Sequence, residues 1–170
     1  MNNLKVILDA TPLIYLAKLG KIKLLKKLFD EVLVPEKVYQ EVVVIGKKEG
    51  YSDSLIVENA IKEGWIFVES VQSDKNLEDH APELDLGEIE VLGLGERYKE
   101  DEILLLIDDA AGRKLAAAFG FDVKGTIYVL LKGYKNGILS KKETKELLNK
   151  LIQNGFRLSP EVYSRLLKEL

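Results

Sequence analysis

The chain has 170 residues, of which 46% are hydrophobic and 31% charged, and its formal net charge is -3. It contains no cysteine and one histidine, which excludes disulfides, thiolate metal sites, cysteine nucleophiles and most imidazole-rich metal centres. The mildly acidic balance argues against a general nucleic-acid coating protein, and no apolar run approaches the roughly 18 residues that suggest a membrane span. We expect a soluble, cytoplasmic protein without a membrane partner, folded as one domain over residues 1–170, with a core over about 4–137 and C-terminal helices over about 140–170.

Short apolar runs alternate with helical periodicity along the first half of the chain. Val6 to Leu8 is predicted to form a strand, and Thr11 is expected to cap a helix with Pro12 in its first turn. The helical spacing of leucines continues past Gly20 to Leu28. The next elements are expected to be a strand at 31–35, a helix that reaches the 46–50 loop, a helix at 55–61 and a strand at 65–70.

The second half repeats this alternation and then becomes wholly helical. After a polar loop to Glu83, we expect a helix around 89–98, a strand at 103–107, a helix to Phe119 and a strand at 121–123. Thr126 is expected to cap a helix that runs from Ile127 toward Asn136. Two amphipathic helices follow, capped by Ser140 and Ser159. Strands separated by helices predict a parallel sheet of four to five short strands in a three-layer α/β/α domain with a C-terminal helical extension.

Carboxylates stand where such a sheet places functional residues, beyond the carboxyl ends of strands. Asp9 follows the first strand, and Asp108 and Asp109 follow the most apolar strand, although local turns and helix caps would also explain these positions. Glu88 completes a capping-box pattern with Asp85, and Glu41 lies on the flank of an apolar helix stripe, where an ordinary solvated glutamate is the simpler interpretation.

Taken together, these acids predict a metal centre. Several carboxylates in one place repel each other unless a cation neutralises them, and oxygen-only ligands favour Mg²⁺ or Mn²⁺ over zinc. Such a centre activates water and stabilises charge on a phosphoryl oxygen, which is the chemistry of nucleases and phosphatases. A dehalogenase-type phosphatase would need a second acid where Thr11 stands, and a response-regulator receiver would need its acidic pair at the first strand.

Five motifs resemble, in their order, those of the PIN-domain superfamily, and most closely its prokaryotic, VapC-related branch of largely uncharacterised proteins. They are "ILDATPLIYLAKLG", "VPEKVYQEV", "LDLGEIEVLGLGE", "LLLIDDAAGRKLAAAFGFDVKGTIYVLLKGYKNGIL" and "LIQNGFRLSPEVYSRLL". The resemblance runs from Lys5 to the end of the chain. It implies an endoribonuclease that uses Mg²⁺ or Mn²⁺ and leaves a 5′-phosphate and a 3′-hydroxyl.

The resemblance also implies which residues carry the reaction. Asp9 matches the first acid, with Thr11 as a supporting hydroxyl; Glu41 matches the second; Glu88 matches the third, where better-studied toxins have aspartate. The fourth acid is Asp108 or Asp109, and the sequence leaves that choice open.

Partners are also implied by the resemblance. The substrate is RNA, whose phosphates would be contacted by Arg113 and Lys114 or by the lysines between Lys18 and Lys27, although a solvated helix face is the simpler interpretation for the lysines, and an internal salt bridge to the acid cluster is an equal alternative for Arg113. The chain is expected to form a homodimer and to be the toxin of a type II toxin–antitoxin pair, with an antitoxin protein as partner. The alternative is a catalytically silent PIN-like module that binds RNA or protein.

Overall fold

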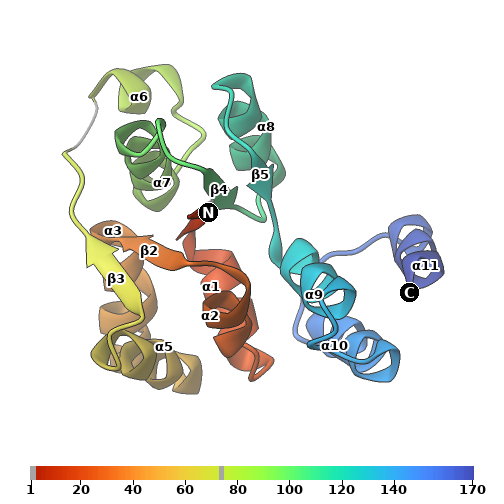
Figure 1. Cartoon of the computed structure of the whole chain (residues 1–170). Helices are drawn as coiled ribbons and strands as arrows, with labels where there is room; N and C mark the ends of the chain where they lie inside the picture. Colours follow the sequence, from red (N-terminus) through yellow and green to blue (C-terminus); the bar gives the residue numbers. More distant parts are fainter. Residues whose placement is uncertain (1–2, 73–74) are drawn as a thin grey trace. The chain divides into compact units, whose positions relative to one another are not determined.

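The computed structural model describes residues 3–72 and 75–170. The chain divides into two compact units, Met1–Thr126 and Ile127–Leu170. The first unit contains the whole sheet, and the second contains helices (Figure 1). In the described part of the chain, no helix is both long enough and apolar enough to cross a bilayer.

The centre of the first unit is a five-stranded parallel sheet with the strand order β3-β2-β1-β4-β5. Its strands are β1 (Lys5–Leu8), β2 (Glu31–Pro35), β3 (Ile66–Glu69), β4 (Ile103–Leu106) and β5 (Val123–Lys124). Every residue of β1 is buried, as expected for a central strand that is covered on both faces. The apolar runs noted in the sequence therefore belong to β1 and to its two neighbours in the sheet, β2 and β4.

The strand order reverses beside β1. From β1 the chain moves outward through β2 to β3, and then returns to place β4 on the other side of β1. β1 and β4 pair from Lys5 with Ile103 to Leu8 with Leu106. In open parallel sheets, the crevice beyond the carboxyl ends of the strands at this switch point is the usual ligand site.

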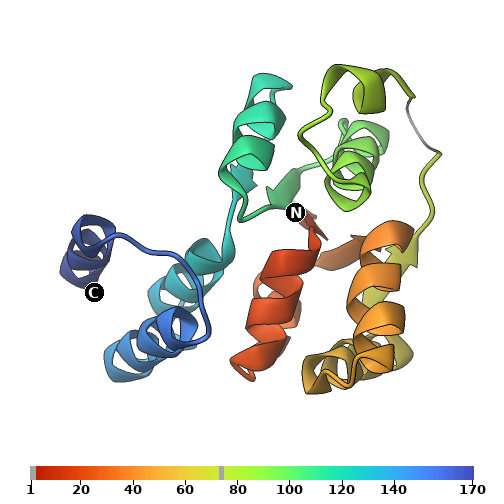
Figure 2. The ribbon, with the colours of Figure 1, turned by 180° about the vertical axis from the view of Figure 1, so that it is seen from behind.

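One face of the sheet is covered by helices from the first two crossovers (Figures 1 and 2). These are α1 (Ala10–Lys18) and α2 (Lys23–Leu28), between β1 and β2, and α5 (Ser52–Lys62), which precedes β3. Between β2 and α5 the chain forms α3 (Glu36–Tyr39), the π-helix η1 (Gln40–Ile45) and α4 (Gly46–Lys48) without a break. A π-helix is rare and is frequent at functional sites.

The opposite face is covered by α6 (Lys75–His80), α7 (Leu86–Arg97) and α8 (Ala110–Ala118) (Figure 1). α7 contacts β1, β2 and β4, which places it across the middle of the sheet. Helices on both faces confirm the expected three-layer α/β/α class.

The second unit consists of α9 (Thr126–Lys135), whose first residue belongs to the first unit, together with α10 (Lys141–Gln153) and α11 (Pro160–Glu169). Ser140 and Ser159 cap α10 and α11 through their hydroxyl oxygens, as the sequence predicts. Buried leucines of α10 form the centre of this unit, at Leu147, Leu148 and Leu151.

Four local predictions were wrong. α1 begins at Ala10, so its N-cap is Asp9 and not Thr11. The segment expected to be a loop before Glu83 contains α6, although residues 73 and 74 lie outside the described chain. Gly46 continues a helix, with Ser54 Oγ in the place that a side chain would need, and the last strand is β5 at Val123–Lys124, displaced from the predicted 121–123.

Candidate active site

Five carboxylates gather near the carboxyl ends of β1 and β4: Asp9, Glu41, Asp85, Glu88 and Asp109. We call these residues the acid cluster. These carboxylates repel one another, and the charges of neighbouring acids contribute to the raised pKa values of Asp9, Glu41 and Glu88. They come from four separate parts of the chain, and only the sheet topology brings them together.

Asp9 is the most deeply buried aspartate of the cluster, with 6% of its surface exposed. Its backbone amide donates to the Leu106 carbonyl at 3.0 Å, which fixes Asp9 beside the end of β4. Burial, with added contributions from the charges of Asp85, Glu88 and Glu41, raises the pKa of its carboxyl from 3.8 to about 7 against the opposing effect of the Ala10 amide. Although Asp9 stands at the N-cap of α1, its side chain makes no capping hydrogen bond within the described residues. Its position is therefore not explained by a capping role.

Glu88 enters the cluster from the first turn of α7, where it also completes the predicted capping box. Its amide donates to Asp85 Oδ1 at 2.8 Å, and its Oε2 accepts from the Asp85 amide at 3.0 Å. Burial is the main cause of the raised pKa of Glu88, and the charges of Asp85, Asp109 and Glu41 add to it. The local and the functional interpretation of Glu88 are thus compatible, because one oxygen serves the helix and the other remains available.

Two glycines create the space for these carboxylates. A Cβ on Gly87 would lie 3.5 Å from Asp9 Oδ1 and 3.3 Å from Asp85 Oδ1. A Cβ on Gly112 would lie 3.0 Å from Glu88 Oε1. The helix backbones of α7 and α8 therefore approach the carboxylates where a side chain would crowd them.

Glu41 lies on η1 and is exposed at the residue level. Partial desolvation of its carboxyl group nevertheless raises its pKa, and the charge of Asp85 raises it further, while Lys37 opposes this shift. Glu41 thus borders the cluster from the solvent side, and it is carried by the π-helix.

Asp108 and Asp109 have different roles in the structure. Asp109 caps α8, with its Oδ2 accepting from the Gly112 amide at 2.8 Å, and its charge acts on Glu88. Asp108 instead uses both carboxylate oxygens on Thr126: Oδ1 accepts from the amide at 2.8 Å, and Oδ2 accepts from the hydroxyl at 2.6 Å. Burial raises the pKa of Asp108, whereas these two bonds and the Arg113 charge lower it.

The residues around Asp108 lock it in this position. Thr126 is fully buried, and Arg113 donates to the Asp108 carbonyl at 2.9 Å. A Cβ on Gly125 would lie only 2.6 Å from Asp108 Oδ1, so this turn requires glycine. Asp108 therefore fixes the connection from β5 into α9, and Asp109 is the member of the pair that faces the other acids.

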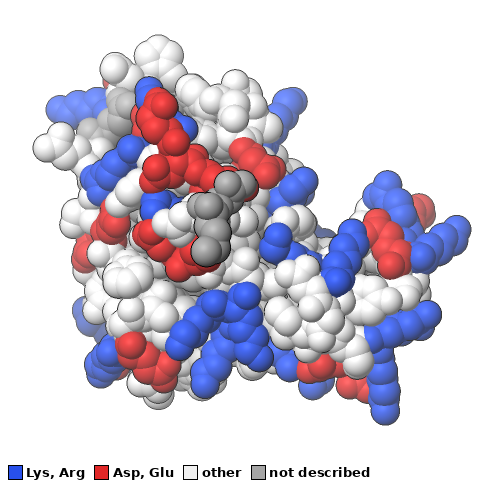
Figure 3. Space-filling view, viewed as in Figure 1, with Lys and Arg blue, Asp and Glu red and all other residues white. Residues whose placement is uncertain are grey.

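The residues predicted to contact the substrate do not gather in one place as the acids do. Arg113 donates to the Asp108 carbonyl, and Lys114 and Thr11 are exposed. Among the described residues, none of these three side chains hydrogen-bonds to a carboxylate of the cluster. Lysines gather where α2 lies on the surface (Figure 3). They belong to the group between Lys18 and Lys27.

The donor set has the chemistry of a Mg²⁺ or Mn²⁺ site, since every candidate ligand atom is a carboxylate oxygen. Burial and like charges raise the pKa of three cluster members, and a bound divalent cation would relieve both effects. Within the described residues, however, no three Asp, Glu or His side chains converge closely enough to hold one ion. Three carboxylates can therefore bind one ion only if side chains of the cluster rotate toward a common point.

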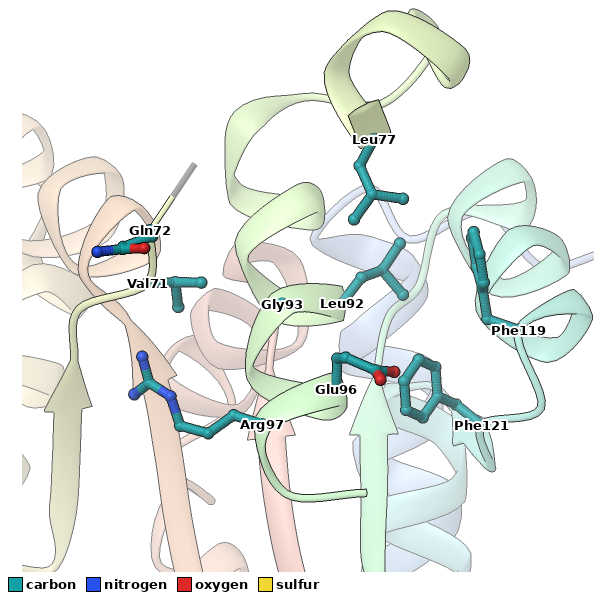
Figure 4. A pocket seen from close by; sticks show the side chains of 9 residues that line it. All are labelled: Val71, Gln72, Leu77, Leu92, Gly93, Glu96, Arg97, Phe119 and Phe121. Atoms are coloured by element: carbon teal, nitrogen blue, oxygen red, sulfur yellow. The ribbon is translucent and has the colours of Figure 1, made fainter. Parts of the chain in front are cut away.

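A separate, mainly apolar cavity of about 590 Å³ lies on the outer side of α7 (Figure 4). Leu92, Phe119 and Phe121 form part of its lining, and Glu96 and Arg97 stand at its edge. None of the cluster acids lines it. Glu96 is paired with Lys99, and Arg97 with Glu69, so the charges at this cavity are already neutralised within the chain.

Sequence analysis did not identify Asp85, Gly87 or Gly112 as site residues. The capping box explains Asp85 without any function, because one of its carboxylate oxygens accepts from the Glu88 amide. The sequence does not reveal that the charge of Asp85 also raises the pKa of Glu88. The two glycines gave a usable signal, because each lies in the first turn of a helix, and glycine within a helix is unfavourable by about 1 kcal/mol relative to alanine.

Comparison with known proteins gives one match. The model of a family described as PIN domain matches residues 5–170. No curated protein matches the chain. The matched region includes both compact units and every acid of the cluster.

Proposed function

Because the chain belongs to the PIN-domain family, whose members are typically nucleases, we propose that it is a Mg²⁺- or Mn²⁺-dependent endoribonuclease. The single observation that carries the proposal is the meeting of four separate segments in one acid cluster at the switch point of the sheet. Carboxylates that raise one another's pKa values destabilise the metal-free fold. A cation bound among them would remove this repulsion, and a cation-dependent activity would explain why the acids lie together.

The ligands would come from Asp9, Glu88 and Asp109, with Glu41 and Asp85 completing the negative site. Asp9 and Glu88 are the buried members, so their carboxylates gain most from a cation. Asp109 is preferred to Asp108, because both oxygens of Asp108 already accept hydrogen bonds from Thr126.

A bound cation would supply an activated water and a Lewis acid for the phosphodiester. The protein's own residues would hold the RNA phosphate beside that cation and position the carboxylates around it. The capping box fixes the backbone at Glu88, and the Leu106 carbonyl fixes the backbone at Asp9, so both carboxylates start from rigid elements. Lys114 and the lysines near α2 would attract the RNA backbone.

The test is cleavage of RNA by the purified chain with Mg²⁺, with Mn²⁺ and with a chelator. Asp9→Asn and Asp109→Asn are expected to lower the rate at least about 100-fold, since each removes a ligand charge. Asp79→Asn, an exposed aspartate of α6 outside the cluster, is the matched control and should retain the wild-type rate. Metal-dependent cleavage that survives Asp9→Asn would contradict the proposed site.

The alternative is a PIN-like module that binds RNA or protein without turnover. The spread of the cluster acids, of which no three in the described chain converge on one ion position, is the observation in its favour. Calorimetric titration with Mn²⁺ separates the two functions. A wild-type chain that binds no Mn²⁺ would favour the silent module.

We also propose a cytoplasmic homodimer from the VapC-related branch, acting as the toxin of a type II pair. Sedimentation of the purified chain tests the dimer. A small neighbouring gene for a DNA-binding antitoxin, and co-purification of its product, would support the toxin role.

A further inference from the structure

The two compact units carry opposite net charges. Residues 1–126 contain 16 Lys and Arg and 24 Asp and Glu, which gives a formal net charge of -8. Ile127–Leu170 contains nine Lys and Arg and four Asp and Glu, which gives +5. We call this second unit the basic unit, and Lys and Arg side chains cover much of the face that Figure 3 shows of it. The slightly acidic composition of the whole chain therefore conceals a segment with the charge of a polyanion-binding surface.

Three of the nine basic residues lie together at the start of α10: Lys141, Lys142 and Lys145. Lys145 follows Lys141 by one helical turn and Lys142 by slightly less, so the three side chains are neighbours on the helix surface. Like charges at these spacings repel, and positive charge in the first turns of a helix opposes its dipole. None of the three forms an ion pair with a carboxylate of the basic unit, every residue of which the structure describes. Such an arrangement costs stability in the free chain and is expected where an anion binds.

The acids of α10 lie elsewhere on the helix. At about 100° per residue, Lys141 and Lys145 border one side of the buried leucine stripe. Glu143 borders the other side of the stripe, and Glu146 lies at the back of the helix. The positive surface formed by Lys141 and Lys145 is therefore not interrupted by these acids.

The basic unit exposes few apolar side chains. The leucines at the centre of α10 are buried, and Ile152, at 38%, is the one large hydrophobic residue that this fully described unit exposes. A helix that binds a membrane surface presents its apolar face to the lipid, and the core of a protein interface is likewise apolar. A basic surface without an exposed apolar face instead suits the phosphates of a nucleic acid.

We propose that the basic unit anchors RNA, with Lys141, Lys142 and Lys145 bound to phosphates of one strand. The proposal rests on the proposed ribonuclease function, because that function makes RNA the polyanion that the chain meets. Side chains at these helical spacings start about 5–6 Å apart, and the flexible stem of lysine lets each ammonium group reach a separate phosphate. Each contact releases a counterion from the strand, so the affinity should fall as the salt concentration rises.

Binding of RNA in a chelator tests this surface without turnover, because the proposed cleavage needs a divalent cation. A fluorescent single-stranded RNA of about 20 nucleotides is titrated with the full chain at several salt concentrations, and its anisotropy is followed. In the triple variant Lys141→Gln/Lys142→Gln/Lys145→Gln, the affinity at about 0.1 M salt should fall at least about tenfold. The slope of log affinity against log salt concentration should become less steep by about 2, since each phosphate contact to a single strand contributes about 0.7.

Two matched triple variants separate the position of the lysines from the net charge. Lys48→Gln/Lys62→Gln/Lys99→Gln removes the same charge from exposed lysines of the first unit and should bind RNA as the wild type does. Lys141→Arg/Lys142→Arg/Lys145→Arg keeps the charge on α10 and should also bind as the wild type does.

The fold of the α10 Lys→Gln variant is checked by circular dichroism. It should melt no lower than the wild type, because the lysines that it replaces repel one another. The proposal would be overturned by loss of the fold in this variant, by unchanged RNA affinity in it, or by an equal loss of affinity in the first-unit variant. Binding of the wild type to vesicles of anionic lipid, with none to RNA, would also overturn it.

Cleavage kinetics separate this proposal from the nuclease proposal. With Mg²⁺ or Mn²⁺, the α10 Lys→Gln variant should show a KM for the same RNA raised about tenfold and a retained kcat, since the lysines hold the strand away from the reacting phosphate. If RNA binds through the three lysines but is not cleaved, the anchoring surface stands and the nuclease proposal fails. If RNA is cleaved with an unchanged KM in the variant, the anchoring surface fails and the nuclease proposal stands.

Discussion

At the scale of single residues, the burial of Asp9 connects stability to the candidate function. The carboxylate lies under α7 with a pKa raised to about 7, mainly through burial. An acid whose pKa is higher in the folded than in the unfolded state holds its proton longer in the fold. Stability is therefore greatest at low pH and is lost as the pH rises from about 4 to about 7.

This pH dependence can be measured in a chelator. The free energy of unfolding of the metal-free chain should fall by roughly 2–4 kcal/mol as Asp9 ionises. Asp9→Asn should remove most of this fall, and should raise the melting temperature at pH 8 while leaving it almost unchanged at pH 4. Mg²⁺ or Mn²⁺ should stabilise the wild type and have little effect on the variant. An Asp9→Asn chain that is less stable than wild type at pH 8 in chelator would show that the carboxylate is a structural group.

Thr126 tests the division of roles between Asp108 and Asp109. Thr126→Val keeps the shape of the side chain but removes the donor to Asp108 Oδ2. The loss should lower the free energy of unfolding by about 1–3 kcal/mol. Thr126→Ser keeps the hydroxyl and is the control. Asp109→Asn should show the opposite pattern, with a large loss of cleavage and a small change in stability. Equal effects on cleavage from the two sites would contradict the assignment of Asp109 to the metal.

At the scale of secondary-structure elements, glycines in α7 and α8 determine how close these helices come to the acids. Gly112 stands in the first turn of α8, where alanine would normally be preferred. An added Cβ would lie 3.0 Å from both Glu88 Oε1 and Ile107 Cγ2, so Glu88 would have to move. At Gly87 the crowded group would be Asp85, whose Oδ1 would lie 3.3 Å from an added Cβ, whereas Asp9 Oδ1 at 3.5 Å would be in ordinary contact.

Gly112→Ala is therefore expected to affect activity more than stability. The gain in helix propensity, about 1 kcal/mol, offsets the crowding, so the melting temperature should change little. Displacement of Glu88 should lower Mn²⁺ affinity and cleavage by about 10- to 100-fold. Calorimetric Mn²⁺ titration and thermal melts of the same samples measure both quantities. Unchanged Mn²⁺ affinity in a folded variant would remove Gly112 from the site.

At the scale of the whole molecule, the question is whether the two compact units fold together. The chain passes from β5 to α9 through Gly125 alone, and Asp108 binds the first residue of α9. The unit at Ile127–Leu170 is small and the chain has no cysteine to cross-link it. Segments of this size seldom provide enough buried surface to fold alone.

We therefore propose that residues 1–170 form one cooperative domain. Calorimetry should record a single unfolding transition whose calorimetric and van't Hoff enthalpies agree. Residues 127–170 expressed alone should be largely unfolded by circular dichroism. Two separate transitions, or a folded isolated segment, would instead establish two domains.

Local sequence patterns are sufficient to predict the alternation of strands and helices, most helix caps and the fold class. β1, β2 and β4 each contain a run of at least three apolar residues, and Ser140 and Ser159 stand directly before amphipathic helices. The π-helix at Gln40–Ile45 and the helix α6 could not be predicted in this way, because their local composition does not distinguish them from an α-helix or a polar loop.

The tertiary structure alone decided which acids lie together. Asp108 and Asp109 are equivalent in the sequence, and they separate only because Thr126, 18 residues later, occupies Asp108. Asp85 looked like a cap until its charge was found to act on Asp9, and Gly87 and Gly112 looked like weak points of helices until carboxylates were found against them. The physical reason is the same for each residue: local pattern fixes where a side chain starts, whereas its electrostatic neighbours come from elements joined only by the strand order of the sheet.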